Sequence, residues 1–546
     1  MPTIESFIHL CFLVGLPIMG IIAVVMAIQT FTLGTQAHQE ACKEKVKAST
    51  NPDTSTHEAY YLGFFHPYPN AGGGGERVLW TMIKAIQDKY PFMVCIIYSG
   101  DSLPRDPLLR NVQAKFGLTI RADTVYIVEL SGRWWVDYKF PRLTLLMQSL
   151  GSVALASQAI HRFCPDVFVE TVGFAFTYPL VRLLSARIPI VAYTHYPAIS
   201  SDMQTMVSSR EAGFNNEAIA KSAWMSALKS VYYKAFALVY SFAGSFASTI
   251  MTNSTWTQNH IVKLFGNPKM TKVVYPPCDT LALADFALAP RQPLIVSLAQ
   301  FRPEKNHKLQ IEAFAHLLQI RPDFVMPRTE SPMDSESLLE KCRDSVVEYP
   351  VLVMIGGARN IEDEARAEEL RQMAKRLGVD RQVLVIVNAP WSRILEWLQV
   401  AKVGMHTMRD EHFGINIVEM MAAGLLTIAH DSAGPKLDII APAIRSAGDM
   451  PTDKEVEEFN AGLGKGMEVL QMEFPVGFVA TTAEEFAESM SLALSADEGL
   501  VGAVQRAARA TASTKFSEDA FRDAFYKRFS PVVRWLDNQR SPNDDE

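Results

Sequence analysis

Four consecutive glycines, Gly72–Gly75, separate an apolar run that ends at Phe65 from a stretch with helical spacing. Glycine lets the backbone adopt positive φ and lets a ligand approach the amide groups. The helix that follows begins with unpaired N–H groups and a partial positive charge. Such a loop suits an anion, often a phosphate. It matches neither of the two common glycine-rich nucleotide motifs, so a simple turn is the alternative interpretation.

A second group of charged residues follows apolar runs in the C-terminal half. Arg302 and Lys305 come directly after one run. Glu411 comes after another, and Glu419 lies on a predicted helix that begins near Phe413–Gly414. A guanidinium and an ammonium group neutralise a diphosphate, and a carboxylate accepts two hydrogen bonds from a ribose diol. Each residue alone fits a solvated surface group, but together they favour a nucleotide-diphosphate site.

The elements that must hold these residues alternate between short apolar runs and helical stretches. Strands are predicted at 59–65, 92–99, 124–130, 166–172, 189–195, 249–254 and 272–277, and then at 293–301, 351–357, 382–388, 403–408 and 425–432. This alternation is typical of parallel βαβ units. A loop-like break near 278–291 divides the two series. The fold class is therefore α/β, with two doubly wound Rossmann-like domains that face a cleft.

Ligands of open parallel sheets bind beyond the carboxyl ends of the strands, so the residues after each strand are site candidates. In the first domain these include His66, which precedes the glycines, and His195. Both histidines have a structural alternative, because His66 could shape the loop and His195 could cap a turn.

Composition narrows the function further. The net charge of −7 gives no case for nucleic acid as a partner. The six cysteines are far apart and form no C-x-x-C, so neither a zinc site nor a disulfide framework is indicated. The chain contains no D-x-D, and basic side chains are expected to take the place of a metal ion.

The N-terminus is predicted to be a membrane anchor. Phe7–Leu33 is mostly apolar and long enough to span a bilayer. The residues before it lack the basic region of a signal peptide. Lys43, Lys45 and Lys47 follow the span, so the positive-inside rule places the body of the protein in the cytosol. Two aromatic stretches, at 131–147 and 230–248, are either further membrane contacts or buried helices.

The spacing of Glu411 and Glu419 around Phe413 and Gly414 resembles the E-x(7)-E signature of retaining glycosyltransferases with the GT-B fold, in the large family 4 of nucleotide-sugar enzymes. Arg302 and Lys305 are similar to that family's basic pair. The resemblance covers nearly all of the chain after Ala59. The stretches "HPYPNAGGGGERVLW" and "THYPAISSDM", with the apolar N-terminus, most resemble the eukaryotic GDP-mannose-dependent α-1,2-mannosyltransferases of dolichol-linked oligosaccharide assembly.

This resemblance implies a retaining transfer that adds the fourth and fifth mannoses from GDP-mannose to a dolichol-diphosphate oligosaccharide for N-glycosylation, without metal or other cofactor. It implies catalytic roles for Glu411 and His195 beside the mannose. The implied donor-binding residues are Arg302, Lys305, Phe413, Gly414, Ile415 and Glu419, and the implied diphosphate or acceptor loop consists of Gly72, Gly73, Gly74, Gly75 and His66.

The resemblance also implies a place in the cell and a domain plan. The expected location is the endoplasmic reticulum membrane, with partner mannosyltransferases of the same pathway. The expected division is an anchor and linker at 1–58, an acceptor domain at 59–285, a donor domain at 286–514 with a surface insertion at 321–350, and a helical tail at 515–546. Two alternatives stay open: a GT-B transferase with a different nucleotide sugar for a lipid-linked glycan, and a non-catalytic GT-B scaffold subunit.

Overall fold

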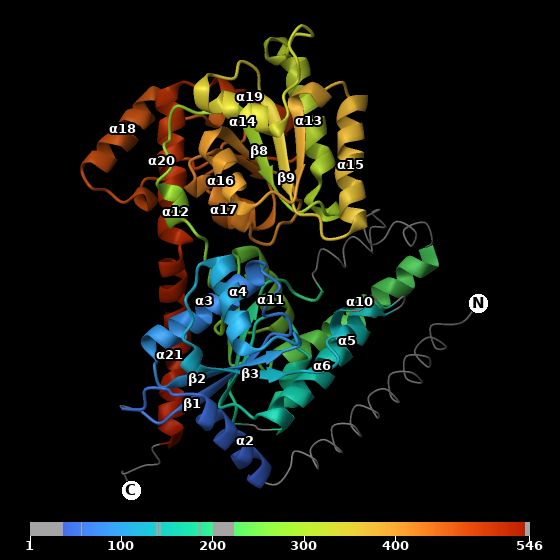
Figure 1. Ribbon diagram of the computed structural model, residues 1–546, viewed down its shortest axis with the longest axis vertical. Helices are drawn as coiled ribbons and strands as arrows, with labels where there is room; N and C mark the ends of the chain where they lie inside the picture. The colour runs from blue at the N-terminus through green and yellow to red at the C-terminus, as the bar shows by residue number, and fades with distance from the viewer. Residues whose placement is uncertain are drawn as a thin grey trace.

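The computed structural model describes residues 36–540 apart from 56, 138–139, 141–142, 185–186 and 200–222. The predicted membrane anchor Phe7–Leu33 lies outside these described residues. Within them, no helix combines the length and the apolar character needed to cross a membrane. Figure 1 shows two α/β bodies, one above the other, with the helix Glu498–Lys515 beside the upper body and the C-terminal helix Glu518–Arg540 beside the lower one.

The first domain is built on a seven-stranded parallel sheet with the order β3-β2-β1-β4-β5-β6-β7. Its strands are β1 (Tyr60–Phe65), β2 (Met93–Ser99), β3 (Val125–Glu129), β4 (Val167–Glu170), β5 (Ile190–Thr194), β6 (Thr249–Thr252) and β7 (Thr271–Val273). Its helices are α2 (Gln36–Ser49), α3 (Gly74–Lys89), α4 (Arg105–Phe116), α5 (Trp134–Asp137), α6 (Thr144–Arg162), α7 (Thr177–Leu184), α10 (Ala223–Gly244) and α11 (Thr255–Phe265). Every residue of β1 and β2 is buried, as expected for strands covered by helices on both faces.

The second domain has a six-stranded parallel sheet with the order β10-β9-β8-β11-β12-β13. Its strands are β8 (Gln292–Leu298), β9 (Val351–Gly356), β10 (Val383–Val387), β11 (Ala401–His406), β12 (Leu426–His430) and β13 (Phe478–Ala480). Its helices are α12 (Leu281–Ala284), α13 (His307–Ile320), α14 (Ser335–Asp344), α15 (Ile361–Arg376), α16 (Trp391–Val400), α17 (Ile415–Ala422), α18 (Asp453–Gly464), α19 (Ala483–Ser495) and α20 (Glu498–Lys515). All the predicted strands are confirmed, and among the described residues β13 is the one strand that was not predicted.

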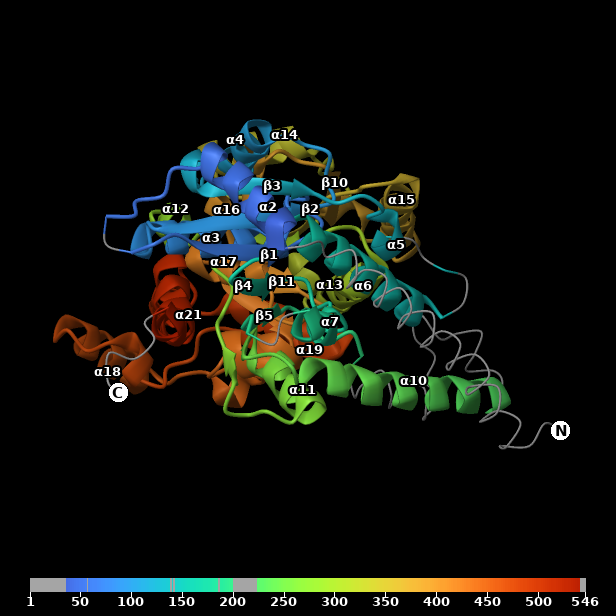
Figure 2. The same cartoon turned by 90° about the horizontal axis from the view of Figure 1, so that it is seen from below.

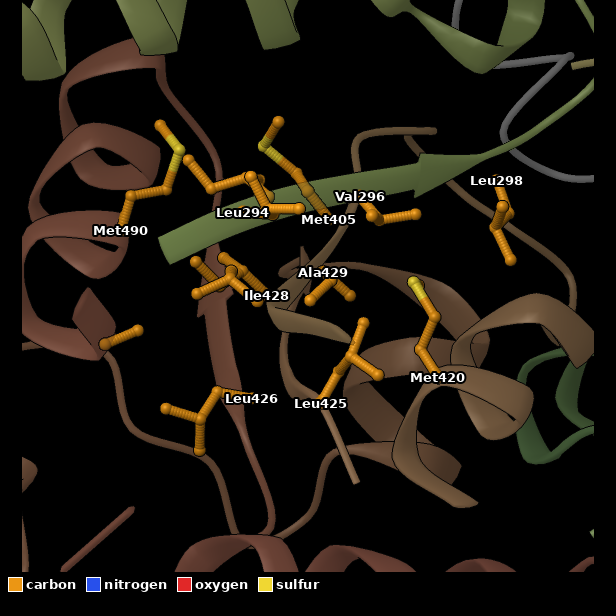
Figure 3. Packing of buried hydrophobic residues seen from close by; sticks show 14 of the residues in the cluster. Leu294, Val296, Leu298, Met405, Met420, Leu425, Leu426, Ile428, Ala429 and Met490 are labelled. Atoms are coloured by element: carbon orange, nitrogen blue, oxygen red, sulfur yellow. The ribbon is translucent and has the colours of Figure 1, made fainter. Parts of the chain in front are cut away.

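The core of the second domain holds α17 against the sheet. Figure 3 shows Met420 of α17 in the same cluster as Val296 of β8 and Ala429 of β12. A Cβ at Gly404 in β11 would lie only 2.6 Å from the sulfur of Met420. The glycine therefore lets the helix approach the strand closely, which fixes the start of α17 relative to the end of β11.

One predicted feature of this domain is wrong. The stretch 321–350 was expected to decorate the surface, but α14 turns Leu338 and Leu339 into the core with exposures of 1% and 2%. The charged residues of α14 face outward and its apolar residues recur at helical spacing. The polar composition of the stretch therefore suggested a surface loop, although it contains a helix that packs on the core.

The C-terminal tail is the helix α21 (Glu518–Arg540), which belongs to the first domain's core. Phe521, Phe525 and Phe529 lie on one face and are each 1% exposed. Tyr526 donates a hydrogen bond of 2.8 Å to the Ala85 carbonyl of α3. From Gln36 onward the chain thus forms most of the first domain, then the second, and returns to complete the first (Figure 1).

Each sheet reverses its strand order at one point, between β1 and β4 in the first domain and between β8 and β11 in the second. At such a point the connecting helices lead away to opposite faces and leave a crevice at the carboxyl ends of the strands. The glycine loop follows β1, Lys305 follows β8 and Glu411 follows β11. The predicted site residues therefore sit at the two crevices.

Candidate active site

The best-defined part of the site is the carboxylate of Glu411. It forms an ion pair with the ammonium of Lys305. It also accepts a hydrogen bond of 3.1 Å from His406 Nε2. The other ring nitrogen of His406 lies 2.9 Å from the amide nitrogen of Asn416, which donates to it and to the Leu298 carbonyl. Because Nδ1 accepts, the proton of the neutral ring lies on Nε2 and points at Glu411.

These contacts keep Glu411 ionised. Burial alone would raise the pKa of the carboxyl, but the hydrogen bond from His406 and the positive charge of Lys305 together hold it well below its usual range. Burial keeps the pKa of His406 below its ordinary value, so the ring stays neutral. The result is a fixed negative charge that can stabilise positive charge on a reacting sugar. His406 and Asn416 were missed from the sequence, although His406 lies just before the predicted motif and Asn416 lies within it.

The start of α17 positions this carboxylate. Gly414 has a φ of +112°, which few other residues adopt. Phe413 is buried and packs against Tyr275 and Phe516, with ring centroids 5.8 and 5.4 Å away. The ring of Phe413 is therefore a packing group between the domains, so the donor contact expected of this residue is left to its backbone. Ile415 is the first residue of the helix.

Glu419 lies one turn further along α17. Among the described residues, none donates a hydrogen bond to its carboxylate. Burial raises the pKa of this carboxyl to about 7; the positive charge of Arg77 opposes the shift and the negative charge of Asp279 adds to it. Because no described residue donates a hydrogen bond to this carboxylate, it can accept the two hydrogen bonds of a ribose diol, as predicted.

GDP-mannose binding is expected to weaken as the pH falls below about 7, because a protonated Glu419 is a poorer acceptor than the ionised group. The affinity should fall by up to about tenfold per pH unit and level off at higher pH. Calorimetric titration with GDP-mannose, which has no phosphate that titrates in this range, measures the slope. In Glu419→Gln the binding should be weak and independent of pH. An unchanged slope in that variant would assign the effect to another group.

Arg302 is placed differently from its predicted partner. Its guanidinium is 41% exposed and contacts the neighbouring Glu304 at 2.8 Å. Among the described residues Arg302 makes no ion pair with Glu411; of the two predicted basic residues, Lys305 contacts that carboxylate. Arg302 is accessible to a ligand. Lys305 is paired with Glu411, so it can contact a diphosphate only by leaving that carboxylate or by contacting both groups at once.

The glycine loop is held by a small network. Thr171 Oγ1 donates to His66 Nδ1 at 2.8 Å, and His66 Nε2 donates to Glu76 Oε1 at 3.2 Å. The other oxygen of Glu76 accepts from the Gly73 amide at 2.5 Å. His66 is only 2% exposed. Its imidazole is therefore engaged in shaping the loop, which is the structural alternative considered for this residue.

His195 is aimed at the same loop. A Cβ at Gly75 would lie 3.5 Å from its Nε2, which is buried and has no hydrogen-bond partner among the described residues. Burial lowers the pKa of His195 to about 4, with His66 adding to the shift, while a hydrogen bond to the Thr171 backbone acts in the opposite direction. That bond uses Nδ1, so Nε2 offers a lone pair to a substrate hydroxyl.

The two halves of the site meet where α3 of the first domain approaches α17 of the second. A Cβ at Gly74, the first residue of α3, would lie 2.7 Å from the Ile415 side chain at the start of α17. The N-termini of both helices thus face each other. Together with Lys305 they offer positive potential from both domains, as a diphosphate requires.

Comparisons with known proteins identify the family of this chain. A family model described as "ALG11 mannosyltransferase N-terminus" matches residues 59–265, and one described as "Glycosyl transferases group 1" matches residues 336–465. A mouse protein named GDP-Man:Man(3)GlcNAc(2)-PP-Dol alpha-1,2-mannosyltransferase is 38% identical over 95% of both chains, and a human protein of the same name is 37% identical over the same share. The chain belongs to the ALG11 mannosyltransferase family.

Solved structures show the fold of this ALG11 family member. Sucrose-phosphate synthase from Thermosynechococcus elongatus superposes with a TM-score of 0.55 at 11% identity, over 87% of this chain and 99% of that one. Anabaena Alr3699/HepE, in complex with UDP and glucose, gives 0.51 at 16% identity, over 86% and 99%. The predicted GT-B architecture of two Rossmann-like domains is confirmed.

Proposed function

We propose that this protein transfers mannose from GDP-mannose, in α-1,2 linkage, to a Man(3)GlcNAc(2) glycan carried on dolichol diphosphate. The observation that carries the proposal is the 38% identity over 95% of both chains to a mouse protein with that name. The resemblance noted in the sequence adds two finer points, which are retention of the α configuration and the addition of the fourth and the fifth mannose by the same enzyme.

The described residues can divide the chemistry between them. Lys305, Arg302 and the two helix N-termini supply positive charge for the departing diphosphate, so the site needs no metal ion for that purpose. Glu411 supplies the negative charge next to the sugar. His195 can hold a sugar hydroxyl from the opposite side. Glu419 accepts hydrogen bonds from the hydroxyl groups of the ribose.

The test is incubation of the full chain, in membranes, with GDP-mannose and a trimannosyl dolichol-diphosphate acceptor. We expect products with one and two additional mannoses that an α-1,2-specific mannosidase removes, and we expect the yield to survive a metal chelator. Competition by GDP but not UDP would support the donor. An inactive preparation that still binds GDP would favour the scaffold alternative, and a preference for UDP-sugars would favour the other transferase.

We further propose an endoplasmic reticulum location with one membrane span and the body in the cytosol. The support is the apolar stretch Phe7–Leu33, the lysines that follow it and an apolar face on α10. Val231, Leu238, Val239 and Phe242 on that helix are 48–73% exposed. Figure 2 shows α10 projecting from the body of the first domain, where such a face could contact lipid.

Protease added to sealed microsomes is expected to digest the body of the protein, because Lys43, Lys45 and Lys47 should keep the following chain on the cytosolic side. Immunoblotting of the digest against both domains measures this. A lumenal marker protein must stay intact as the control. Full protection of both domains until detergent is added would contradict the orientation.

A further inference from the structure

The start of α11 in the first domain is hydrogen-bonded to Asp438 of the second domain. The Thr255 amide donates to Asp438 Oδ2 at 2.9 Å, and the Thr255 hydroxyl donates to Oδ1 at 2.5 Å. Tyr275, which follows β7, also donates to Oδ1 at 2.9 Å. Asp438 lies in the short helical turn Pro435–Ile439 and is 1% exposed. One buried carboxylate thus binds two segments of the other domain.

An aromatic stack forms a second contact directly beside it. The rings of Tyr196 and His412 lie 4.1 Å apart and are tilted by 22°. Trp256, the second residue of α11, continues the stack at 6.0 Å from Tyr196 and 5.4 Å from His412. Tyr196 and Trp256 belong to the first domain and His412 to the second, so the stack joins the two domains.

Both contacts lead directly to the residues proposed to act on the sugar. Tyr196 follows His195 in the chain, and His412 follows Glu411. The turn that carries Asp438 is joined to the same loop, because the Gly434 amide donates to the Glu411 carbonyl at 3.0 Å. A Cβ at Gly434 would lie 2.6 Å from the His412 carbonyl oxygen. The loop that carries Glu411 and His412 is therefore hydrogen-bonded to, and closely packed against, the turn that carries Asp438.

We propose that Tyr196, Trp256 and His412, together with Thr255 and Asp438, form an interdomain clasp that sets the spacing between His195 and Glu411 across the cleft. Tyr196 and His412 are positioning residues in this arrangement, and what the clasp requires of them is a flat ring. Only the kinetic consequence of the clasp rests on the proposed function; its effect on the domain contact does not.

The kinetic test replaces His412. His412→Ala is expected to lower kcat by about a hundredfold, the scale of the loss when reacting groups are misplaced by roughly 1 Å. GDP affinity should not change, since the groups proposed to hold the nucleotide are intact. His412→Phe keeps a flat ring and is expected to recover most of the lost turnover. A His412→Phe enzyme as slow as His412→Ala would overturn the proposal, because the imidazole nitrogens would then be what matters.

A double-mutant cycle tests whether the two rings act together. Tyr196→Ala should also lower kcat, and the Tyr196→Ala/His412→Ala enzyme should be no slower than either single variant, because each change already breaks the stack. Independent, multiplicative losses would overturn the clasp. Unaltered thermal unfolding of each variant is the control for folding.

Hydrogen exchange provides a readout that does not depend on activity. In the full chain, His412→Ala is expected to speed exchange at the start of α11, where the Thr255 amide is bound by Asp438. The substituted residue lies outside that segment. Unchanged protection there would overturn the clasp. If wild-type protein transferred no mannose while this exchange difference appeared, the proposed function would fail and the clasp would stand.

Discussion

Glu411→Ala is expected to lower kcat by about two to three orders of magnitude while the protein still binds GDP, because the lost carboxylate acts on charge that develops only during transfer. Its removal also releases the ammonium of Lys305, which is then free to pair with the diphosphate. GDP affinity should therefore stay the same or rise. Initial rates and calorimetry with GDP measure the two effects separately.

Two further variants control this prediction. Glu411→Gln keeps an acceptor for His406 but not the charge, so it should be nearly as slow as the alanine variant. Glu419→Ala should instead weaken both GDP and GDP-mannose, because a ribose contact is used equally in the ground and transition states. If Glu411→Ala lost GDP binding and Glu419→Ala kept it, the two roles would be reversed.

Gly74→Val is expected to abolish transfer in a protein that still folds. The glycine begins α3 where this helix faces the start of α17, and even a single carbon there would meet Ile415 at 2.7 Å. A valine would also cover the amides that we assign to the diphosphate or the acceptor. Transfer assays and thermal unfolding of the full chain measure activity and folding.

The matched control is Gly464→Val, at a glycine whose added carbon would meet no atom within 4 Å. That variant should retain its turnover. Combining Gly74→Val with Ile415→Ala removes the steric contact but not the shielding of the amides, so transfer should stay lost. Normal turnover in Gly74→Val itself would reduce the loop to a connecting turn.

A rule about sheet edges grouped the candidate site residues from the sequence alone. Residues after parallel strands converge whatever the helices between them do, so the glycine loop, Lys305 and Glu411 could be grouped before their distances were known. The same rule does not say which groups pair. Lys305 and Arg302 were assigned a common role, yet one lies against Glu411 and the other against Glu304. Two side chains of the same charge can adopt different rotamers and can be attracted by different neighbouring carboxylates. Their spacing in the sequence shows neither.

Contacts between segments that are far apart in the chain could also not be predicted from the sequence. The spacing of Phe521, Phe525 and Phe529 indicates a helix with one apolar face, but not that the face completes the first domain's core. In the same way, nothing in the pattern around Asp438 shows that its partner is Thr255. Such partners depend on how the two sheets are set against each other, and periodicity carries no information about that.

The return of α21 to the first domain has a consequence for biosynthesis. A ribosome that has finished β7 must still translate the whole second domain before Phe521 appears. At about 5–20 residues per second this takes roughly 10–50 s, during which the first domain has an open apolar surface where α21 will pack. The nascent chain should therefore depend on chaperones for that interval, and a premature stop codon near the end of the message should damage the domain that was translated first.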